Sequence, residues 1–133
     1  MIRQWTQYKS GPNKRGRGEA HVTLNCRGVF FINKHAIEMM GRPEAVQLFY
    51  DERHAVIGLR PSEPDAQFAF PLKVMSGGES SRILSASGFC SRFKIKPTSA
   101  YTIAFPRPEI DHDGILILDI HSAVETKREK AAR

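Results

Sequence analysis

The chain has 133 residues and a mass of 15.0 kDa, enough for one compact core or for two small units that share one. With 41% apolar and 26% charged residues, it has the composition of a folded protein rather than a disordered one. No apolar run approaches the roughly 18 residues that span a bilayer, and the first ten residues lack the apolar stretch of a signal peptide. We therefore expect a cytoplasmic protein without membrane contact.

The net charge of +6 is concentrated in the two ends of the chain. Residues 1–20 carry five cationic residues and one anionic residue, residues 121–133 carry four and two, and the residues between them sum to zero. Mobile basic segments can follow phosphates without a preformed pocket, so this distribution favours a polyanionic partner. The alternative is that charged ends only raise solubility. We predict a basic flexible arm over residues 1–20 and a basic tail over residues 121–133.

A first unit of strand, helix and hairpin is predicted over residues 21–61. Val22, Leu24 and Cys26 alternate with polar residues, which is typical of a half-buried strand. Gly28 marks a bend, and the β-prone apolar run 29–32 follows it.

The helix of this unit is predicted over residues 34–40. Asn33 can cap its start, and Gly41 can end it. The apolar runs 46–50 and 55–59 are separated by four polar residues, which predicts a hairpin.

The second half repeats this order of elements. Residues 62–80 are rich in proline and glycine and are expected to form a linker that touches the body through Phe68 and Phe70. A second unit follows over residues 81–120. It has a strand at 82–88, a short helix at 89–95 that Pro97 cannot continue, and two further strands at 101–105 and 115–118 joined by a turn.

Matching positions in the two halves keep nearly constant offsets. Gly28 matches Gly88 at an offset of 60, Val46 matches Tyr101 at 55, and the strands that follow match again at 60. Residue identity is slight, so an accidental agreement is the alternative to a structural duplication. Two units of this size would bury little alone, which favours packing them together.

The segment 27–41 with the hairpin that follows resembles the AbrB/MazE-like swapped-hairpin domain. In that family a glycine-containing β-segment ends in Ile-Pro, a short helix that ends in Leu-Gly comes next, and a hairpin follows. The order and spacing match over residues 21–61, and residues 81–120 look like a weaker second copy. The fold class implied is α+β and β-rich, with two tandem strand-helix-hairpin units packed as a pseudo-symmetric swapped-hairpin or small β-barrel body.

The resemblance implies DNA binding through basic residues on the strands and at the helix start, as in bacterial regulators and antitoxins. Asn33 replaces the family's proline, Ile37 stands where a helical arginine is usual, and no Gly-Asp precedes the hairpin. These departures bear on base-specific recognition more than on the fold, since phosphate contacts can come from elsewhere. The expected nucleic-acid-binding residues are Lys9, Lys14, Arg15 and Arg17 in the arm, Arg27 and Lys34 in the first unit, and Arg92 and Lys94 in the second.

Catalytic and cofactor motifs give weaker signals than these. Residues 111–114, Asp-His-Asp-Gly, could hold a cation, but Asp-Gly is itself a hairpin signal. Residues 76–81 lack the lysine and spacing of a phosphate-binding loop. The aromatic and basic residues of 89–94 could stack on a single strand, although at helical spacing the rings are expected to face the core. We predict no catalytic site, metal or cofactor.

The function predicted from these observations is that of a non-enzymatic DNA-binding protein, a transcriptional regulator of AbrB-like type acting on duplex DNA. The alternative is a protein-protein interaction or antitoxin-like assembly module that binds no nucleic acid and uses its β-rich segments to pair with a partner protein. Both a monomer with internal pseudo-symmetry and a homodimer are compatible with the sequence.

Overall fold

Two β-sheets and two short helices surround a single apolar core in a computed structural model of the chain. It describes residues 4–6, 19–75, 78–95, 97 and 101–127. Sheet A has six strands, in spatial order β11 (Val124–Lys127), β8 (Tyr101–Phe105), β1 (Val22–Leu24), β2 (Val29–Ile32), β7 (Gly78–Ser85) and β6 (Lys73–Met75). Sheet B has five, in spatial order β5 (Phe70–Pro71), β3 (Ala45–Asp51), β4 (Val56–Ser62), β10 (Leu116–Asp119) and β9 (Glu109–Ile110). The fold is therefore α+β and β-rich.

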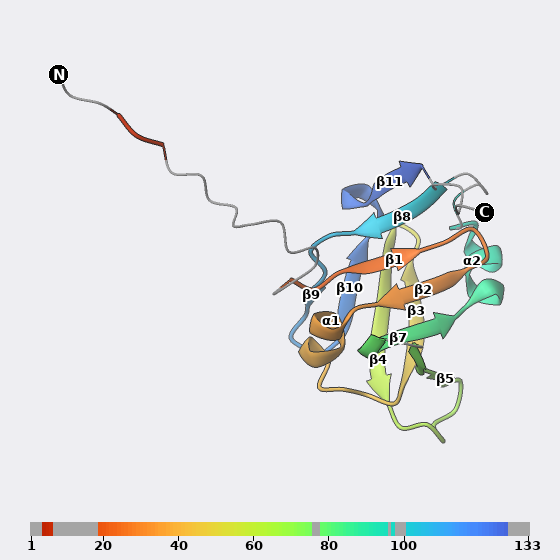
Figure 1. The fold of residues 1–133 in the computed structure, drawn as a ribbon. Coiled ribbons are helices and arrows are strands. Elements are labelled where there is room, and N and C mark those ends of the chain that lie inside the picture. Colours follow the sequence, from red (N-terminus) through yellow and green to blue (C-terminus); the bar gives the residue numbers. More distant parts are fainter. Residues whose placement is uncertain (1–3, 7–18, 76–77, 96, 98–100, 128–133) are drawn as a thin grey trace, which may run out of the picture.

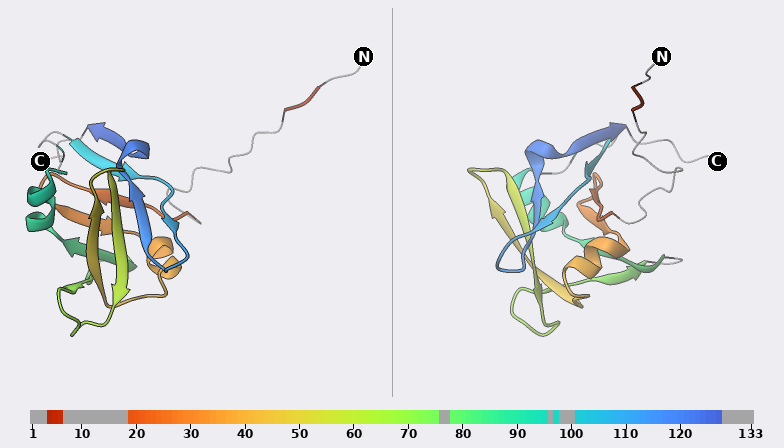
Figure 2. Two further views of the ribbon diagram at one scale, coloured as in Figure 1. Left: turned by 180° about the vertical axis from the view of Figure 1, so that it is seen from behind. Right: turned by 90° about the vertical axis from the view of Figure 1, so that its left-hand side faces the viewer.

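The strands of sheet B run across those of sheet A, and the helices α1 (Lys34–Met39) and α2 (Ser87–Phe93) lie at opposite ends of the layers (Figures 1 and 2). A 3₁₀ turn, η1 (Ile120–Ser122), leads from β10 to β11. Alternate residues of each sheet point inward and form one core, which includes Phe30 and Leu84 from sheet A and Leu59 and Leu118 from sheet B, all without exposed surface.

The first predicted unit is confirmed in its elements. Asn33 caps α1 by accepting a hydrogen bond from the backbone N–H of Ala36 at 3.0 Å, and Gly41 follows the helix in the left-handed region, with φ at +82°. β3 and β4 pair in register from Asp51 opposite Val56, so that four residues form the loop between them. The predicted hairpin is therefore present.

The second predicted hairpin is wrong. β8 pairs with β1 and β11 in sheet A, whereas β10 pairs with β4 and β9 in sheet B. A loop of four residues holds β3 and β4 side by side, but the ten residues between β8 and β10 are long enough for the chain to change sheets. The helix of this half begins at Ser87, two residues earlier than predicted, and ends at Phe93.

The predicted linker and tail also take part in the sheets. Within residues 62–80, β5 pairs with β3 while β6 pairs with β7, so this segment passes from sheet B to sheet A. Leu72 lies between these two strands and is buried, which explains why the segment is held in place. Phe70 packs on the core as predicted, but Phe68 is 78% exposed. Residues 124–127 of the predicted tail form β11.

The described strands form two open sheets rather than a closed barrel. The segment from β5 to β6 passes from sheet B to sheet A. β8 and β10, which belong to different sheets, do not pair with each other. Among the described helices, none is long and apolar enough to cross a membrane.

Candidate nucleic-acid interface

The outer face of sheet A carries one continuous row of side chains across all six strands. Val22 and Leu24 are fully buried, so Thr23 between them points away from the core. Strand pairing places five further residues in line with Thr23 on the same face, each directly opposite the next. In spatial order the row is Val124, Ala104, Thr23, Phe31, Ile83 and Lys73.

A cleft of about 480 Å³ lies beside this row, on the same face. His21, Asn33 and Ser81 stand two residues along β1, β2 and β7 from the row and therefore point the same way. These three residues line the cleft together with Glu19, Lys34, His35 and Pro106. The cleft, called here the His21 cleft, combines imidazole, amide, hydroxyl and ammonium groups, which are the donors that phosphate oxygens accept from.

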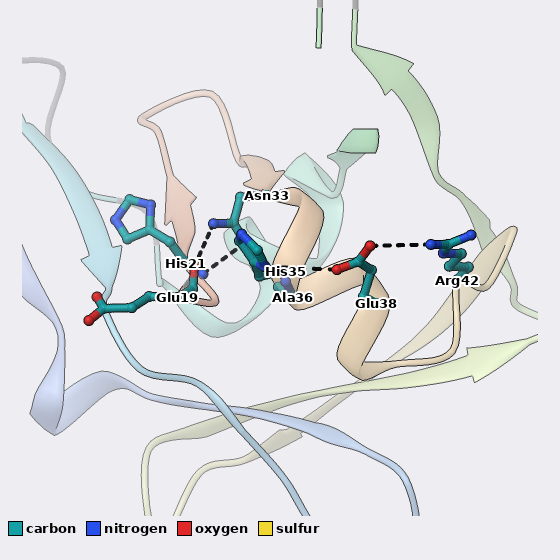
Figure 3. A network of polar contacts seen from close by, with 7 residues as sticks. All are labelled: Glu19, His21, Asn33, His35, Ala36, Glu38 and Arg42. Carbon is teal, nitrogen blue, oxygen red and sulfur yellow. Dashed lines mark hydrogen bonds and ion pairs between the residues drawn. The ribbon is translucent and has the colours of Figure 1, made fainter. Parts of the chain in front are cut away.

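Asn33, which lines the His21 cleft, connects the start of α1 to the segment that enters β1 (Figure 3). Its Oδ1 accepts hydrogen bonds from the backbone N–H groups of Ala36 and His21, both at 3.0 Å, and its Nδ2 donates to the carbonyl oxygen of Glu19 at 2.8 Å. The backbone N–H of Asn33 donates to the carbonyl oxygen of His21 at 3.0 Å. One side chain thus fixes the start of α1 against the chain that enters β1. A proline at this position would lack that N–H.

On the exposed side of α1, the carboxylate of Glu38 is paired with neighbouring basic side chains. Glu38 Oε2 accepts a hydrogen bond from Arg42 Nη2 at 3.2 Å, and Glu38 Oε1 lies 3.8 Å from His35 Nδ1 (Figure 3). Because Glu38 is engaged there, Lys34 stands at the cleft without a carboxylate aimed at it from α1. The local potential at the cleft is therefore set by Lys34 and by Glu19 at the cleft's other wall.

Charge is divided between the two sheets, although the centre of the chain is neutral. Sheet A, the segment that enters it, the helices and the turns that join them carry seven cationic and four anionic residues, while sheet B and its turns carry four and nine. The cationic residues of the first group are Arg27, Lys34, Lys73, Arg82, Arg92, Lys94 and Lys127. Arg92 and Lys94 lie at the end of α2 beside Tyr50 of β3, so sheet A itself has only a small excess of cations, whereas sheet B and its turns carry a clear excess of carboxylates. A polyanion is therefore repelled more strongly from the sheet B side than from the sheet A side.

The predicted cationic residues of the body do not form one cluster. Arg27 and Lys34 lie at opposite ends of β2, roughly 20 Å apart along the strand at about 3.3 Å per residue. Arg27 belongs to the β1–β2 turn, which packs on the start of α2. Arg92 and Lys94 lie at the other end of α2 and line a separate cleft beside Tyr50. Of the predicted body residues, Lys34 lines the His21 cleft.

The predicted arm residues Lys9, Lys14, Arg15 and Arg17 lie outside the described residues. Their place in the sequence is still informative, because Arg17 precedes the cleft residue Glu19 by two positions. The basic segment therefore joins the body at the His21 cleft.

Sequence reasoning missed His21, His35 and Ser81 as members of a site. His21 could have been found, because it keeps the alternation of Thr23 and must share its face of the strand. Ser81 could not, since it meets His21 only through the pairing of β7 with β2, which the sequence pattern does not specify.

Residues 111–114 form the turn that their sequence predicts. Asp111 Oδ1 accepts hydrogen bonds from the backbone N–H groups of Asp113 and Ile115, both at 2.9 Å. Across the part of the chain that the structure describes, no group of three histidine, cysteine or acidic residues could hold a metal ion.

The His21 cleft and the row beside it thus form one surface that combines apolar side chains with the hydrogen-bonding groups of His21, Asn33, Lys34 and Ser81, at the point where a basic segment enters the fold. Comparison with family models, with curated proteins and with solved structures finds no match to this chain. The AbrB/MazE-like resemblance accordingly stays a prediction that depends on the residues quoted for it.

Proposed function

We propose that the protein is a non-enzymatic DNA-binding regulator whose outer face of sheet A lies against duplex DNA, with the basic arm adding sequence-independent affinity. The observation that carries this proposal is the division of charge between the sheets, together with the entry of the arm at the His21 cleft. Lys34, His21 and Ser81 supply donors for phosphate oxygens, and Lys73 adds a cation at the end of the outer row.

The pairing of strands between the halves supports the AbrB-like part of the proposal. β2 of the first half pairs antiparallel with β7 of the second, and β4 pairs antiparallel with β10. β1 flanks β2 as β6 flanks β7. An approximate twofold relation between the halves accounts for these contacts, with one chain supplying both copies that a swapped-hairpin dimer takes from two. The departure from that symmetry is that β3 pairs with β4 in the first half, whereas β8 and β10 do not pair with each other in the second.

A salt titration of the full chain on a labelled 20-base-pair duplex of mixed sequence tests the proposal. We expect log Kd to rise linearly with log salt concentration, because each neutralised phosphate releases counterions. Replacing Lys14, Arg15 and Arg17 together by alanine should flatten the slope by about 2 to 3, and Lys34→Gln should flatten it by about 1. Fluorescence anisotropy at several salt concentrations gives both numbers.

Arg53→Gln is the matched control, because Arg53 is exposed in the β3–β4 turn of the acidic sheet. It removes the same charge and should leave the slope unchanged. An unchanged slope in the triple variant would remove the arm from the mechanism. An equal effect of Arg53→Gln and Lys34→Gln would remove sheet A as the binding face.

A further inference from the structure

Strand β3 leaves most of one edge open, on the sheet that the proposed DNA site does not use. β3 pairs with β4 over its whole length, from Ala45 to Asp51, but β5 covers it only at Ala45 and Val46. Among the described strands, residues 47–51 therefore form an edge of sheet B. Such an edge offers a row of backbone donors and acceptors that an extended chain can pair with.

Aromatic side chains build a cleft of about 390 Å³ along this edge. The cleft is lined by Leu48, Phe49, Arg60, Phe68, Phe70 and Phe89, with Gln47 at one end. Phe49 is 44% exposed and Phe68 is 78% exposed, which is unusual for large apolar rings beside one another.

Phe68 is held in this position against a backbone preference. Its φ of +64° lies in the left-handed region, which costs a bulky residue about 1–2 kcal/mol. The loop that presents it is fastened, because Gln47 Nε2 donates to the carbonyl oxygen of Gln67 at 2.9 Å. Arg60 in turn donates to Gln47 Oε1 and stacks 5.1 Å from the centre of the Phe49 ring. An exposed aromatic ring on a strained and anchored loop points to a binding role.

A second cleft, of about 340 Å³, lies farther along the same strand. It is lined by Tyr50 and Glu52 from the β3 side and by Arg92, Phe93 and Lys94 from α2. The Tyr50 ring packs on Phe93 at 4.9 Å between centroids, which fixes α2 alongside β3. Tyr50 of the second cleft contacts Phe89 of the first, at 6.4 Å between ring centroids, and the two clefts together are called here the Phe68 groove.

The Phe68 groove is cationic within an acidic sheet. Arg60, Arg92 and Lys94 line it beside one carboxylate, that of Glu52, and none of the three forms an ion pair with a carboxylate of the described residues. Glu63 and Asp65 lie in the loop that presents Phe68. A short acidic segment neutralises the three cations and ends there. A longer nucleic-acid strand would also place phosphates beside the acidic turns of sheet B, which repel them.

We propose that the open edge of β3 binds an extended acidic peptide segment of a partner protein as an added strand. The peptide backbone pairs with residues 47–51, an apolar side chain enters the cleft between Phe49, Phe68 and Phe89, and carboxylates meet Arg60 and Arg92. Main-chain pairing supplies affinity in this mode, and the cleft supplies selectivity. This site lies at the edge of sheet B and the proposed DNA site on the outer face of sheet A, so each can be tested separately, but Arg92 and Lys94 then belong to the groove and not to the DNA site.

A nine-residue fluorescein-labelled peptide that alternates glutamate with leucine tests the site on the full chain. We expect saturable binding by anisotropy, with amide NMR shifts concentrated in residues 47–51. A peptide with lysine in place of glutamate should bind at least about 10-fold more weakly, because it faces three cations. A glutamate-leucine peptide N-methylated on alternate residues has no N–H donor on one edge of the strand, and the series methylated on the edge that faces β3 should lose affinity by a similar factor.

Phe68→Gly separates binding from folding. Glycine removes the ring and relieves the strained φ, so thermal stability should be unchanged or higher while peptide affinity falls about 10-fold or more. Arg60→Glu should weaken the peptide by a similar factor, and Arg53→Glu, the same reversal outside the groove, should not.

Three outcomes would overturn the proposal. One is equal peptide binding by wild type and Phe68→Gly. Another is displacement of the peptide by an equimolar single-stranded oligonucleotide, which would make the groove a nucleic-acid site. The third is a homodimer in sedimentation that Arg60→Glu dissociates, which would make a second copy of the chain the occupant.

Discussion

Sheets A and B share one interior but present opposite exteriors. Their inward residues form a single core, yet sheet A with the helices carries an excess of cations while sheet B carries an excess of anions. A neutral central sequence thus conceals a body with two distinct sides. The difference shows that the surface charge of each sheet can vary without a change in the core that the two sheets share. Only the outward positions of each strand are free to vary, because the inward positions are fixed by packing.

The largest expected effect tests the shared interior. Phe30→Ala in sheet A should lower the free energy of unfolding by about 3–5 kcal/mol, and Leu59→Ala in sheet B by about 2–5 kcal/mol, since both side chains are fully buried. Each variant should unfold in one transition that abolishes both sheets. Denaturant unfolding followed by circular dichroism and tyrosine fluorescence measures this. Separate transitions would mean that the sheets are independent units.

The next effect concerns the attachment of sheet A to α2. Gly28 has a φ of +78°, and a Cβ there would lie 2.6 Å from the Cα of Ser87. Gly28→Ala should therefore cost about 1–3 kcal/mol of stability. Gly88→Ala is the matched control, because a Cβ there meets nothing within 4 Å and the residue is helical. That variant should be stabilised by about 0.5–1 kcal/mol, and the opposite order would contradict the packing.

A smaller effect is expected at the floor of the His21 cleft. Asn33→Ala removes the helix cap and the bonds to His21 and Glu19, and should cost about 1–2 kcal/mol in thermal or chemical unfolding. Asn33→Asp keeps the acceptor and loses only the donor to Glu19, so its loss should be smaller. If Asn33→Asp were as destabilising as Asn33→Ala, the capping bond would not be the main contribution.

The smallest effect is a pH dependence on the acidic side. A hydrogen bond from His54 to Asp51 lowers the pKa of the Asp51 carboxyl below its ordinary value of 3.8. A lowered pKa in the folded state stabilises the fold above pH 3.8, and this contribution disappears as the pH falls through the folded pKa. Asp51→Asn should therefore lower the melting temperature slightly at neutral pH, with a difference that shrinks below pH 3.8. A difference independent of pH would contradict this account.

Local signals predicted the first half of the fold well. Alternation located β1, and Asn33 with Gly41 bounded α1, because caps and turns depend on residues within a few positions of one another. The same kind of signal placed strands at β8 and β10 but could not say what they pair with. Pairing depends on distant partners and on the length of the connection, so the second hairpin was predicted wrongly.

Each candidate site likewise combines residues that sequence patterns locate with residues that only the fold brings beside them. Lys34 was found from its place at a helix start, but the His21 cleft also needs Ser81 from β7, and the Phe68 groove needs Phe89 from α2 beside Phe49 from β3. The rings of Phe89 and Phe93 do pack on one face of α2 as their spacing predicts. That this face lies along an open strand edge follows only from the packing of α2 against Tyr50.

The sequence by itself determined the β-rich class, the bounds of α1 and the first hairpin, since these depend on side-chain alternation and on turn chemistry within short stretches. Only the tertiary structure decided that the chain crosses between sheets at Leu72, that β8 and β10 separate, and that opposite charges collect on opposite sides. The physical reason is that burial rewards any arrangement that covers the apolar faces, so strand partners are chosen by the fit of the whole core rather than by neighbouring residues.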